Sequence, residues 1–261
     1  MHRPATVEQP TANPPPQPDP ELANRQWRTA YAEIAQLAGG LAHEIRNPLS
    51  TMRMNLDLLA EEFAHPETPR DHRVLRKIER VRRESHRLES ILESFLRFAR
   101  IQQIQTAPAD LNALVEEVRD FCDGQGTAQG IVSRAIYEPG LPPVCLDQDL
   151  IKQALLNLIL NAQLAMPDGG ELILRTRRDD HAAIIDVIDT GTGIPAEILP
   201  RIFDAFFSTR PGGSGLGLPT TRKIIEAHGG SIDVESEPGR GTRFTIRLPL
   251  SQPASSSPDP S

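Results

Sequence analysis

The chain of 261 residues has little cysteine. Cys122 and Cys145 lie far apart and form no CxxC pair, which excludes a disulfide scaffold and a paired-cysteine metal site. We therefore expect both to be reduced, buried thiols of a cytosolic protein.

Long apolar runs and an excess of basic charge are also missing. No stretch approaches the ~20 apolar residues of a membrane-spanning helix, and residues 1–4 do not begin a signal peptide with an apolar core. Lys and Arg number 28 against 35 Asp and Glu, and this formal net charge of −7 argues against general nucleic-acid binding. The sequence predicts a soluble, cytoplasmic protein without a membrane span or a nucleic-acid partner.

Composition divides the chain into four parts. Residues 1–23 are rich in Pro, Gln and Asn, and residues 251–261 are rich in Ser and Pro, so both ends are expected to be disordered tails. Residues 24–106 have helical spacing throughout, whereas residues 107–250 mix helical and strand patterns. We predict a helical domain followed by a mixed domain, with an α+β fold class overall.

Two long helical patterns fill the first domain. Apolar residues recur every three or four positions in the first pattern, at Ile34, Leu37, Leu41, Ile45, Leu49, Met52, Leu56, Leu59 and Phe63. The second follows a heptad spacing, at Val74, Ile78, Val81, Ser85, Leu88, Leu92, Phe95 and Ala99. Between them, Thr68, Pro69 and Asp71 have the order of a helix N-cap, a first-turn proline and a capping box.

The two patterns predict a long antiparallel helical hairpin. Two helices alone leave much of their apolar stripes uncovered, so we expect a homodimer in which two hairpins form a four-helix bundle. The alternative, in which the hairpin folds back onto the second domain, is less economical because both stripes span many turns.

His43 lies off the apolar stripe of the first helix. At ~100° per residue it is nearly opposite Leu41 and Ile45, so it is expected to face water, with Glu44 beside it and Asn47 one turn further on. A neutral imidazole with a carboxylate neighbour can act as a nucleophile. The alternative is an ordinary solvated histidine. Pro48 disfavours it, because a proline inside a helix costs ~3 kcal/mol by colliding with the carbonyl four residues earlier, here that of Glu44. Such a kink one turn after an exposed histidine is costly in a helix with no special task.

Charge is uneven along the second helix. From residue 70 to residue 100, Arg and Lys clearly outnumber Asp and Glu. This surface is either a docking face for an acidic partner or a solvated helix face, and the sequence leaves both interpretations open.

The second domain alternates between the two types of periodicity. Helices are expected at 111–121, 148–166 and 219–227, and strands at 131–137, 171–177, 182–188, 231–235 and 242–248. This mixture predicts a two-layer α/β sandwich of about 140 residues. The stretch 102–109, between the domains, is expected to be a hinge.

Three amides fall on one face of the apolar helix at 148–166. Gln153, Asn157 and Asn161 are spaced at i, i+4 and i+8, and asparagine is a poor helix former. Their carbonyl oxygens suit Mg²⁺, which binds few protein ligands beside phosphates and water. A polar stripe facing solvent is the alternative.

Two glycine-rich segments and a phenylalanine cluster follow. Asp189, at a strand end before Gly191 and Gly193, could accept hydrogen bonds from an amino group such as that of adenine. Gly213–Gly217 leads into a helix N-terminus, which favours phosphate binding, although a flexible linker would look similar. Phe203, Phe206 and Phe207 form either a latch for a mobile lid or ordinary packing.

In this order, the elements resemble the transmitter region of two-component sensor histidine kinases. The correspondence covers about residues 30 to 250 and consists of six motifs in the family's order and spacing. These are the phosphoacceptor box His43-Glu44-Ile45-Arg46-Asn47-Pro48-Leu49, the N box Asn157–Asn161, the first glycine box Asp189–Gly193, the F box Phe203–Phe207, the second glycine box Gly213–Gly217, and the closing motif Gly239-Arg240-Gly241-Thr242 with Phe244 and Leu248-Pro249.

The resemblance implies an ATP-dependent protein-histidine kinase. By it, His43 accepts the γ-phosphoryl group of ATP, Glu44 takes the imidazole proton, and Asn47 matches a position linked to phosphatase activity. The phosphoryl group then passes to an aspartate on the receiver domain of a response regulator. The ATP-binding sandwich would be of the type shared with Hsp90, gyrase and MutL.

The resemblance also implies a site for ATP and Mg²⁺. Mg²⁺ would be held by Asn157 and Asn161, and the adenine amino group would be bound by Asp189. The remaining nucleotide contacts would be Gly191, Gly193, Phe207, Arg210, Gly213, Gly215, Leu216 and Gly217.

The chain departs from the family in some respects. Arg210 stands where many members carry Lys, which keeps the charge but changes its geometry. The segment between Phe207 and Gly213 is short, as in soluble nitrogen-regulation kinases. We expect no sensor domain before the helices, because residues 1–23 are predicted to form only a disordered tail. Two other functions are compatible with parts of the sequence. An ATP-driven machine could use the same sandwich but would need no His43, and a non-catalytic dimeric scaffold is disfavoured by the nucleotide motifs.

Overall fold

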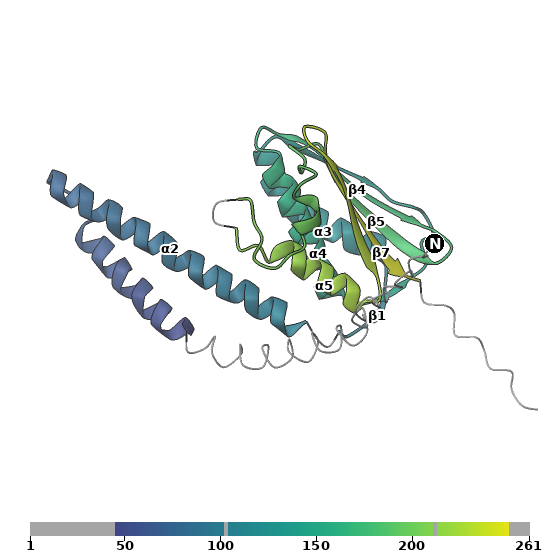
Figure 1. Ribbon diagram of the computed structural model, residues 1–261, viewed down its shortest axis with the longest axis horizontal. Helices are drawn as coiled ribbons and strands as arrows, with labels where there is room; N and C mark the ends of the chain where they lie inside the picture. The colour runs from purple at the N-terminus through teal and green to yellow at the C-terminus, as the bar shows by residue number, and fades with distance from the viewer. Residues whose placement is uncertain (1–44, 102–103, 211–212, 251–261) are drawn as a thin grey trace, which may run out of the picture.

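The computed structural model describes residues 45–101, 104–210 and 213–250. A helical hairpin extends away from a compact unit of helices and strands (Figure 1). His43, Glu44 and both predicted tails lie outside the described residues. Within the described ranges, no helix is long and apolar enough to cross a membrane.

The hairpin joins a helix at 45–62 to α2 (Pro69–Arg100). Thr68 is the N-cap of α2: its side chain accepts a hydrogen bond from the Asp71 N–H, and the Asp71 carboxylate accepts one from the Thr68 N–H. The predicted capping box is therefore confirmed, and with it the start of the second helix.

One copy of the hairpin covers only part of its apolar surface. Leu49 and Ile78 are buried, and the Arg53 guanidinium lies 3.3 Å from the Glu89 carboxylate, so the two helices are held together. Several large apolar side chains remain exposed: Ile45, Met52, Met54, Leu58, Leu59, Val81 and Leu88. This is the surface that the predicted dimer would cover.

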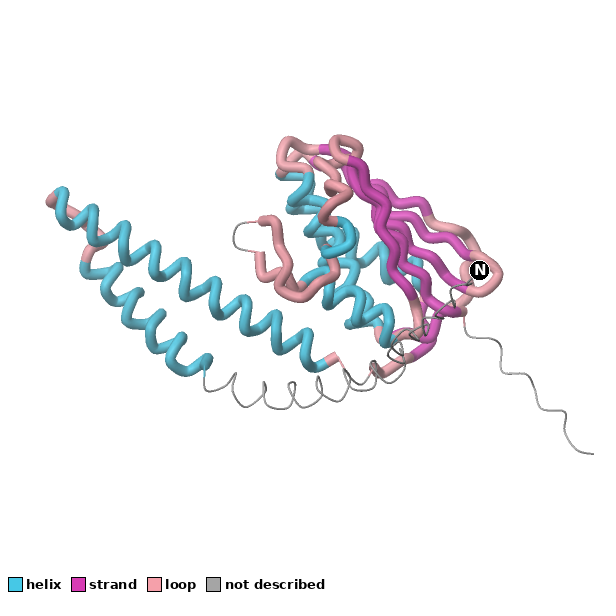
Figure 2. The backbone as a smooth tube through the Cα atoms, in the orientation of Figure 1, coloured by secondary structure: helices cyan, strands magenta, loops and turns pink. Residues whose placement is uncertain are grey.

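The rest of the chain forms the expected two layers. A five-stranded sheet has the order β2-β4-β5-β7-β6, in which β2 and β4 are parallel and the other neighbours antiparallel. Three helices lie against one face of this sheet (Figure 2). The strands are β2 (Ile131–Ile136), β4 (Gly170–Arg178), β5 (Ala182–Asp189), β6 (Ser231–Glu237) and β7 (Gly241–Pro249), and the helices are α3 (Leu111–Ala128), α4 (Gln148–Ala165) and α5 (Gly217–Ala227).

A second, two-stranded sheet was not predicted. β1 (Ala107–Ala109) pairs antiparallel with β3 (Val144–Leu146), and both are too short to show an alternating pattern. Residues 107–109 are paired with β3, so they belong to the mixed domain. The expected hinge at 102–109 therefore extends too far at its C-terminal end. The prediction of two buried cysteines is also wrong for one of them: Cys122 is buried, but Cys145 is exposed, because alternate residues of β3 face opposite ways.

Helix α4 is anchored along one side by the core. Ile151, Leu155, Leu158 and Ile159 are at most 1% exposed and belong to one apolar cluster with residues of the central strands. This burial fixes the rotation of α4, so its opposite side presents the same residues in a constant direction.

The C-terminal end of α2 contacts the mixed domain. The Lys223 ammonium on α5 donates a hydrogen bond to the Phe98 carbonyl at 2.8 Å and lies 4.8 Å from the Phe98 ring centre. The last carbonyls of a helix have no partner within the helix and carry the negative end of its dipole, so a cation here stabilises the end of α2.

The outer face of the sheet carries a buried carboxylate. Asp186 is fully buried and accepts hydrogen bonds from Arg175 at 2.7 and 2.9 Å, from Arg177 at 3.0 Å and from Thr245 at 2.8 Å. Burial alone would raise the pKa of Asp186, but these donors prevail and lower it below its ordinary value.

We expect Asp186→Ala to destabilise the protein by about 2 kcal/mol, because Thr245 loses its acceptor and three strands lose a shared partner. The folded-state pKa lies below the unfolded value of about 3.9, so this contribution is complete above that pH and is lost as the pH falls through the folded-state pKa. Urea unfolding of both chains from pH 7 to pH 3 measures the effect.

The matched control is Asp233→Ala, which removes an exposed carboxylate paired with Arg247 on the same face. Its effect should be much smaller at every pH. If the difference in free energy of unfolding between Asp186→Ala and the unaltered chain does not shrink as the pH falls, the stabilisation does not depend on the ionised Asp186 carboxylate and the prediction is wrong.

Candidate functional site

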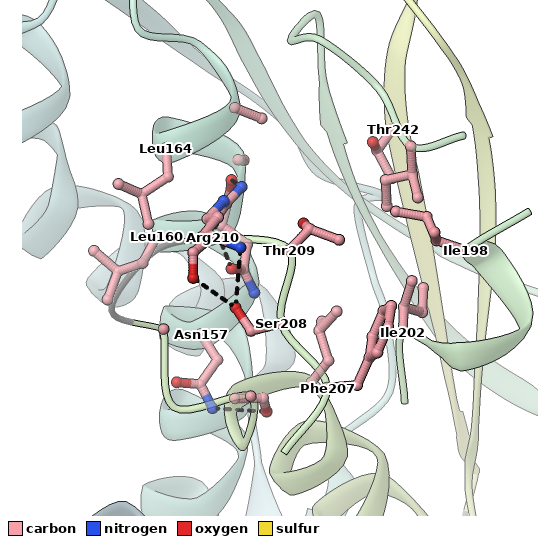
Figure 3. Close-up of a pocket in the computed structure, with 18 of the residues that line it drawn as sticks. Asn157, Leu160, Leu164, Ile198, Ile202, Phe207, Ser208, Thr209, Arg210 and Thr242 are labelled. Carbon is pink, nitrogen blue, oxygen red and sulfur yellow. Dashed lines mark hydrogen bonds between the residues drawn. The ribbon is translucent and has the colours of Figure 1, made fainter. Parts of the chain in front are cut away.

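A cavity of about 520 Å³ opens between α4 and the segment that follows β5. Figure 3 shows Leu160 and Leu164 on one side and Ile202 and Phe207 on the other, with polar groups between these walls. A mostly apolar cavity of this size with a few polar groups is typical of a small-molecule site.

Asp189 lies at the C-terminal end of β5, in the wall of the cavity, and is only 4% exposed. Its carboxylate accepts a hydrogen bond from the Gly191 N–H at 2.8 Å and another from the Thr242 N–H. Burial raises the pKa of Asp189, and these two donors and the charge of Arg210 partly offset that rise. The carboxylate is thus held by the backbone in a fixed direction, as a hydrogen-bond acceptor for a ligand must be.

The chain leaves Asp189 through a turn that only glycine permits. Gly193 has φ of +68°, and a Cβ at this position would collide with the Glu237 carbonyl. The turn therefore runs directly against the end of β6, and the backbone at 192–195 lines the cavity.

Two asparagines project into the cavity from α4. The Asn157 amide donates to the Gly217 carbonyl at 3.3 Å, and the Asn161 side-chain oxygen accepts from Arg210 at 3.0 Å. Gln153, which the sequence placed on the same face, does not line the cavity, because it lies one turn too far toward the start of α4.

The two asparagine oxygens could bind a divalent cation only if other groups supplied the rest of its ligands. Among the described residues, no group of three His, Cys, Asp or Glu side chains could hold a metal. Two amide oxygens match a Mg²⁺ ion that takes the rest of its ligands from phosphates and water. The guanidinium already at Asn161 indicates that this position attracts a cation.

The phenylalanine cluster divides into three roles. Phe203 packs against the core, and Phe207 lines the cavity with the Arg201 guanidinium 4.3 Å from its ring centre. Phe206 has φ of +66°, donates its N–H to the Gly215 carbonyl at 3.0 Å, and places its ring 6.3 Å from that of Phe95 on α2. Ordinary packing therefore describes Phe203, whereas Phe206 connects the cavity loop to the hairpin.

Most of the predicted nucleotide contacts lie around the cavity. Nine line it: Asn157, Asn161, Asp189, Gly193, Phe207, Arg210, Gly213, Gly215 and Gly217. Two do not line it: Gly191, whose N–H bonds to the Asp189 carboxylate, and Leu216, which is fully buried as the N-cap residue of α5. Asn47, the remaining described candidate, is exposed on the hairpin helix.

Sequence reasoning missed several lining residues. Leu160 and Leu164 follow the asparagines along α4, and Leu164 is 63% exposed, but apolar residues on an apolar helix gave no separate signal. Thr242 comes from the start of β7, 53 residues after Asp189, and only the strand pairing of Asp189 with Thr242 brings it there.

Two family models match the chain. Residues 33–104 match the His Kinase A (phospho-acceptor) domain, and residues 146–252 match the histidine kinase-, DNA gyrase B- and HSP90-like ATPase. The chain belongs to the sensor histidine kinase family. The two matched regions are those of a histidine kinase transmitter, in the usual order.

Curated histidine kinases are similar over most of the chain. Signal transduction histidine-protein kinase AtoS of Escherichia coli is 34% identical over 86% of this chain and 37% of its own length. Sporulation kinase A of Bacillus subtilis is 39% identical over 82% of this chain and 34% of its own, and NtrB, a sensory histidine kinase/phosphatase of Azospirillum brasilense, is 33% identical over 89% and 60%. The chain thus spans about a third to three fifths of these relatives.

Solved histidine kinase structures share the fold. Full-length ShkA in complex with AMPPNP has a TM-score of 0.67 at 27% identity and covers 84% of this chain and 47% of that one. ThkA in complex with the response regulator TrrA has a TM-score of 0.62 at 27% identity, over 88% and 66%.

Proposed function

We propose that this chain is an ATP-dependent protein-histidine kinase that phosphorylates His43 and passes the phosphoryl group to an aspartate of a response regulator. The supporting observation is the cavity, in which a backbone-held carboxylate, two asparagines and an arginine converge beside the loop that contacts α2. Kinases of this family combine such a site with a helical hairpin, as this chain does.

Different residues of the cavity would bind different parts of the nucleotide. Asp189 would accept a hydrogen bond from the adenine amino group, and Asn157 and Asn161 would hold Mg²⁺. When bound, Mg²⁺ neutralises phosphate charge. Arg210 and the N-terminus of α5, with its glycines, would bind phosphate oxygens.

Phosphoryl transfer itself needs little covalent help from the protein. An imidazole nitrogen of His43 forms the bond to the γ-phosphorus, the bond to the bridging oxygen breaks, and ADP leaves with that electron pair. Glu44 would take the imidazole proton. Asn47 would serve a separate reaction, the hydrolytic dephosphorylation of the regulator. Positioning by the two domains supplies the main acceleration.

The proposed assembly is a homodimer with domains at 24–106 and 107–250. The exposed apolar side chains of the hairpin support the dimer, since a second copy would bury them. ThkA, a relative of known structure, was solved with a response regulator. The cytoplasmic location expected from the sequence stays a prediction.

The two other functions are less well supported. An ATP-driven machine would use the same sandwich, which one matched model shares with gyrase and HSP90, but it would not need a phosphoacceptor hairpin. A non-catalytic scaffold would not need the polar groups that line the cavity.

Incubation of the full chain with γ-labelled ATP and Mg²⁺ should label the protein through an acid-labile, base-stable bond, as phosphohistidine requires. His43→Gln should remove the label. His72→Gln is the matched control, since His72 is exposed on α2, and should label normally. Equal labelling of His43→Gln and the unaltered chain would show that the phosphoacceptor is elsewhere.

A ridge of arginines on α2 supports an acidic protein partner. Arg73, Arg76, Arg80, Arg83 and Arg87 follow one another at intervals of three and four and are all exposed. At 100° per residue they occupy an arc of roughly 80°. Among the described residues, only Arg87 of the five forms an ion pair, with Glu84 at 3.3 Å.

The ridge stands out from an acidic chain. Residues 70–87 contain eight Lys and Arg against three Asp and Glu, whereas the whole chain carries −7. Such a local field would steer an acidic receiver domain toward the hairpin and raise the association rate.

We expect Arg73→Gln combined with Arg80→Gln to lower kcat/KM for phosphotransfer roughly tenfold at low salt and to flatten its salt dependence. The substrate is chosen by first testing a panel of candidate receiver domains and taking the one to which the unaltered kinase transfers its phosphoryl group fastest. Autophosphorylation should not change.

Arg134→Gln with Arg178→Gln removes the same charge from two exposed arginines of the sheet and is the control. Phosphotransfer that is equally fast and equally salt-dependent in the ridge variant would show that the ridge is only a solvated face.

A further inference from the structure

Arg210 holds the oxygen that the proposed function assigns to the metal. Its guanidinium donates one hydrogen bond to the Asn161 side-chain oxygen at 3.0 Å and a second to the Asn161 backbone carbonyl at 3.2 Å. Figure 3 shows Arg210 lying against α4 beside Leu160 and Leu164. The fork of the guanidinium thus spans two oxygens of one residue on a helix that the core holds fixed.

The backbone of Arg210 is fixed independently of this contact. The Ser208 hydroxyl accepts a hydrogen bond from the Arg210 N–H at 3.2 Å and donates one to the Arg210 carbonyl at 3.3 Å. The Gly213 N–H donates to the same carbonyl at 3.2 Å, and a Cβ on Gly213 would collide with the Ser208 hydroxyl. The turn therefore directs the Arg210 side chain toward α4.

The Arg210 guanidinium remains positively charged in these surroundings. Burial lowers the pKa of Arg210, and Asp189 on the opposite wall of the cavity partly offsets that decrease. Because an arginine normally titrates above pH 12, the guanidinium stays charged at neutral pH.

We propose that Arg210 acts as a built-in cation that occupies Asn161 in the nucleotide-free site and is displaced from it when metal and nucleotide bind. This inference rests on the proposed ATP site. Arg210 would then move to a phosphate, so one residue stabilises the empty site and the loaded site in turn. It would act as a positioning residue that sets how much Mg²⁺ nucleotide binding requires.

Like charge makes the two occupants of Asn161 exclude each other. A divalent ion bound to the side-chain oxygen would lie beside a guanidinium bonded to the same atom, and their repulsion opposes double occupancy. Phosphate offers Arg210 a stronger, charged acceptor, so nucleotide is what frees Asn161. A lysine would reach one of the two Asn161 oxygens at a time and would compete less well.

The test measures binding of a fluorescent ADP analogue to the full chain across a series of Mg²⁺ concentrations. ADP lacks the γ-phosphate and so limits the contribution of Arg210 to phosphate binding. With Arg210→Gln, the half-saturating Mg²⁺ concentration should fall about tenfold, as expected from loss of one charge-assisted hydrogen bond that competes with the metal. Arg210→Lys should fall between this variant and the unaltered chain.

Arg134→Gln is the matched control, since it removes an exposed arginine of β2 that pairs with Glu171 and should leave the Mg²⁺ dependence unchanged. Thermal unfolding of each variant without nucleotide verifies that it is folded.

Three outcomes decide the matter. A lower Mg²⁺ requirement in Arg210→Gln but not in Arg134→Gln supports the inference. An unchanged requirement, with weaker binding at every Mg²⁺ concentration, would mean that Arg210 is only a phosphate ligand and would overturn it. Failure of the unaltered chain to bind the analogue at any Mg²⁺ concentration would contradict the proposed ATP site itself, and the inference with it.

Discussion

The buried end of strand β5 is the constraint on which the cavity depends. β5 lies in the middle of the sheet, so Asp189 is carried into the interior, where its carboxylate is held by backbone N–H groups. The chain can leave this point only through the glycine turn at Gly193. Helix α4 packs against the sheet and brings Asn157 and Asn161 to the other wall of the cavity. A carboxylate and two amides are thus set facing one space by the core rather than by loops.

The cavity is physically connected to the phosphoacceptor hairpin. The Phe206 N–H bonds to the Gly215 carbonyl in the loop that lines the cavity, and its ring lies against Phe95 of α2. Nearby, Lys223 caps the end of the same helix at the Phe98 carbonyl. A rearrangement of the loop around Gly215 would therefore change contacts on α2. A nucleotide bound in the cavity, as proposed above, would thereby influence where the two domains lie relative to each other.

Sequence reasoning succeeded where a feature was local and periodic. The capping box at Thr68 and the asparagines of α4 follow from short-range spacing, and the structure has both. It failed where pairing is tertiary: β1 and β3 are three residues each, and Cys145 was predicted to be buried although it lies on the open side of β3. The bond between Arg210 and Asn161 joins residues 49 apart, so no local pattern encodes it. The phosphoacceptor role of His43 follows from the family resemblance and stays a prediction, since His43 lies outside the described residues.

The proposed function depends most on recognition of an adenine nucleotide in this cavity by Asp189. The most direct measurement compares equilibrium binding of non-hydrolysable ATP and GTP analogues to the full chain and to Asp189→Asn, with Mg²⁺ saturating. We expect the unaltered chain to prefer the ATP analogue strongly, because guanine presents a carbonyl where adenine presents its amino group. Asp189→Asn should lose at least tenfold in affinity for the ATP analogue. Equal binding of the two analogues by the unaltered chain, or undiminished binding by Asp189→Asn, would contradict it.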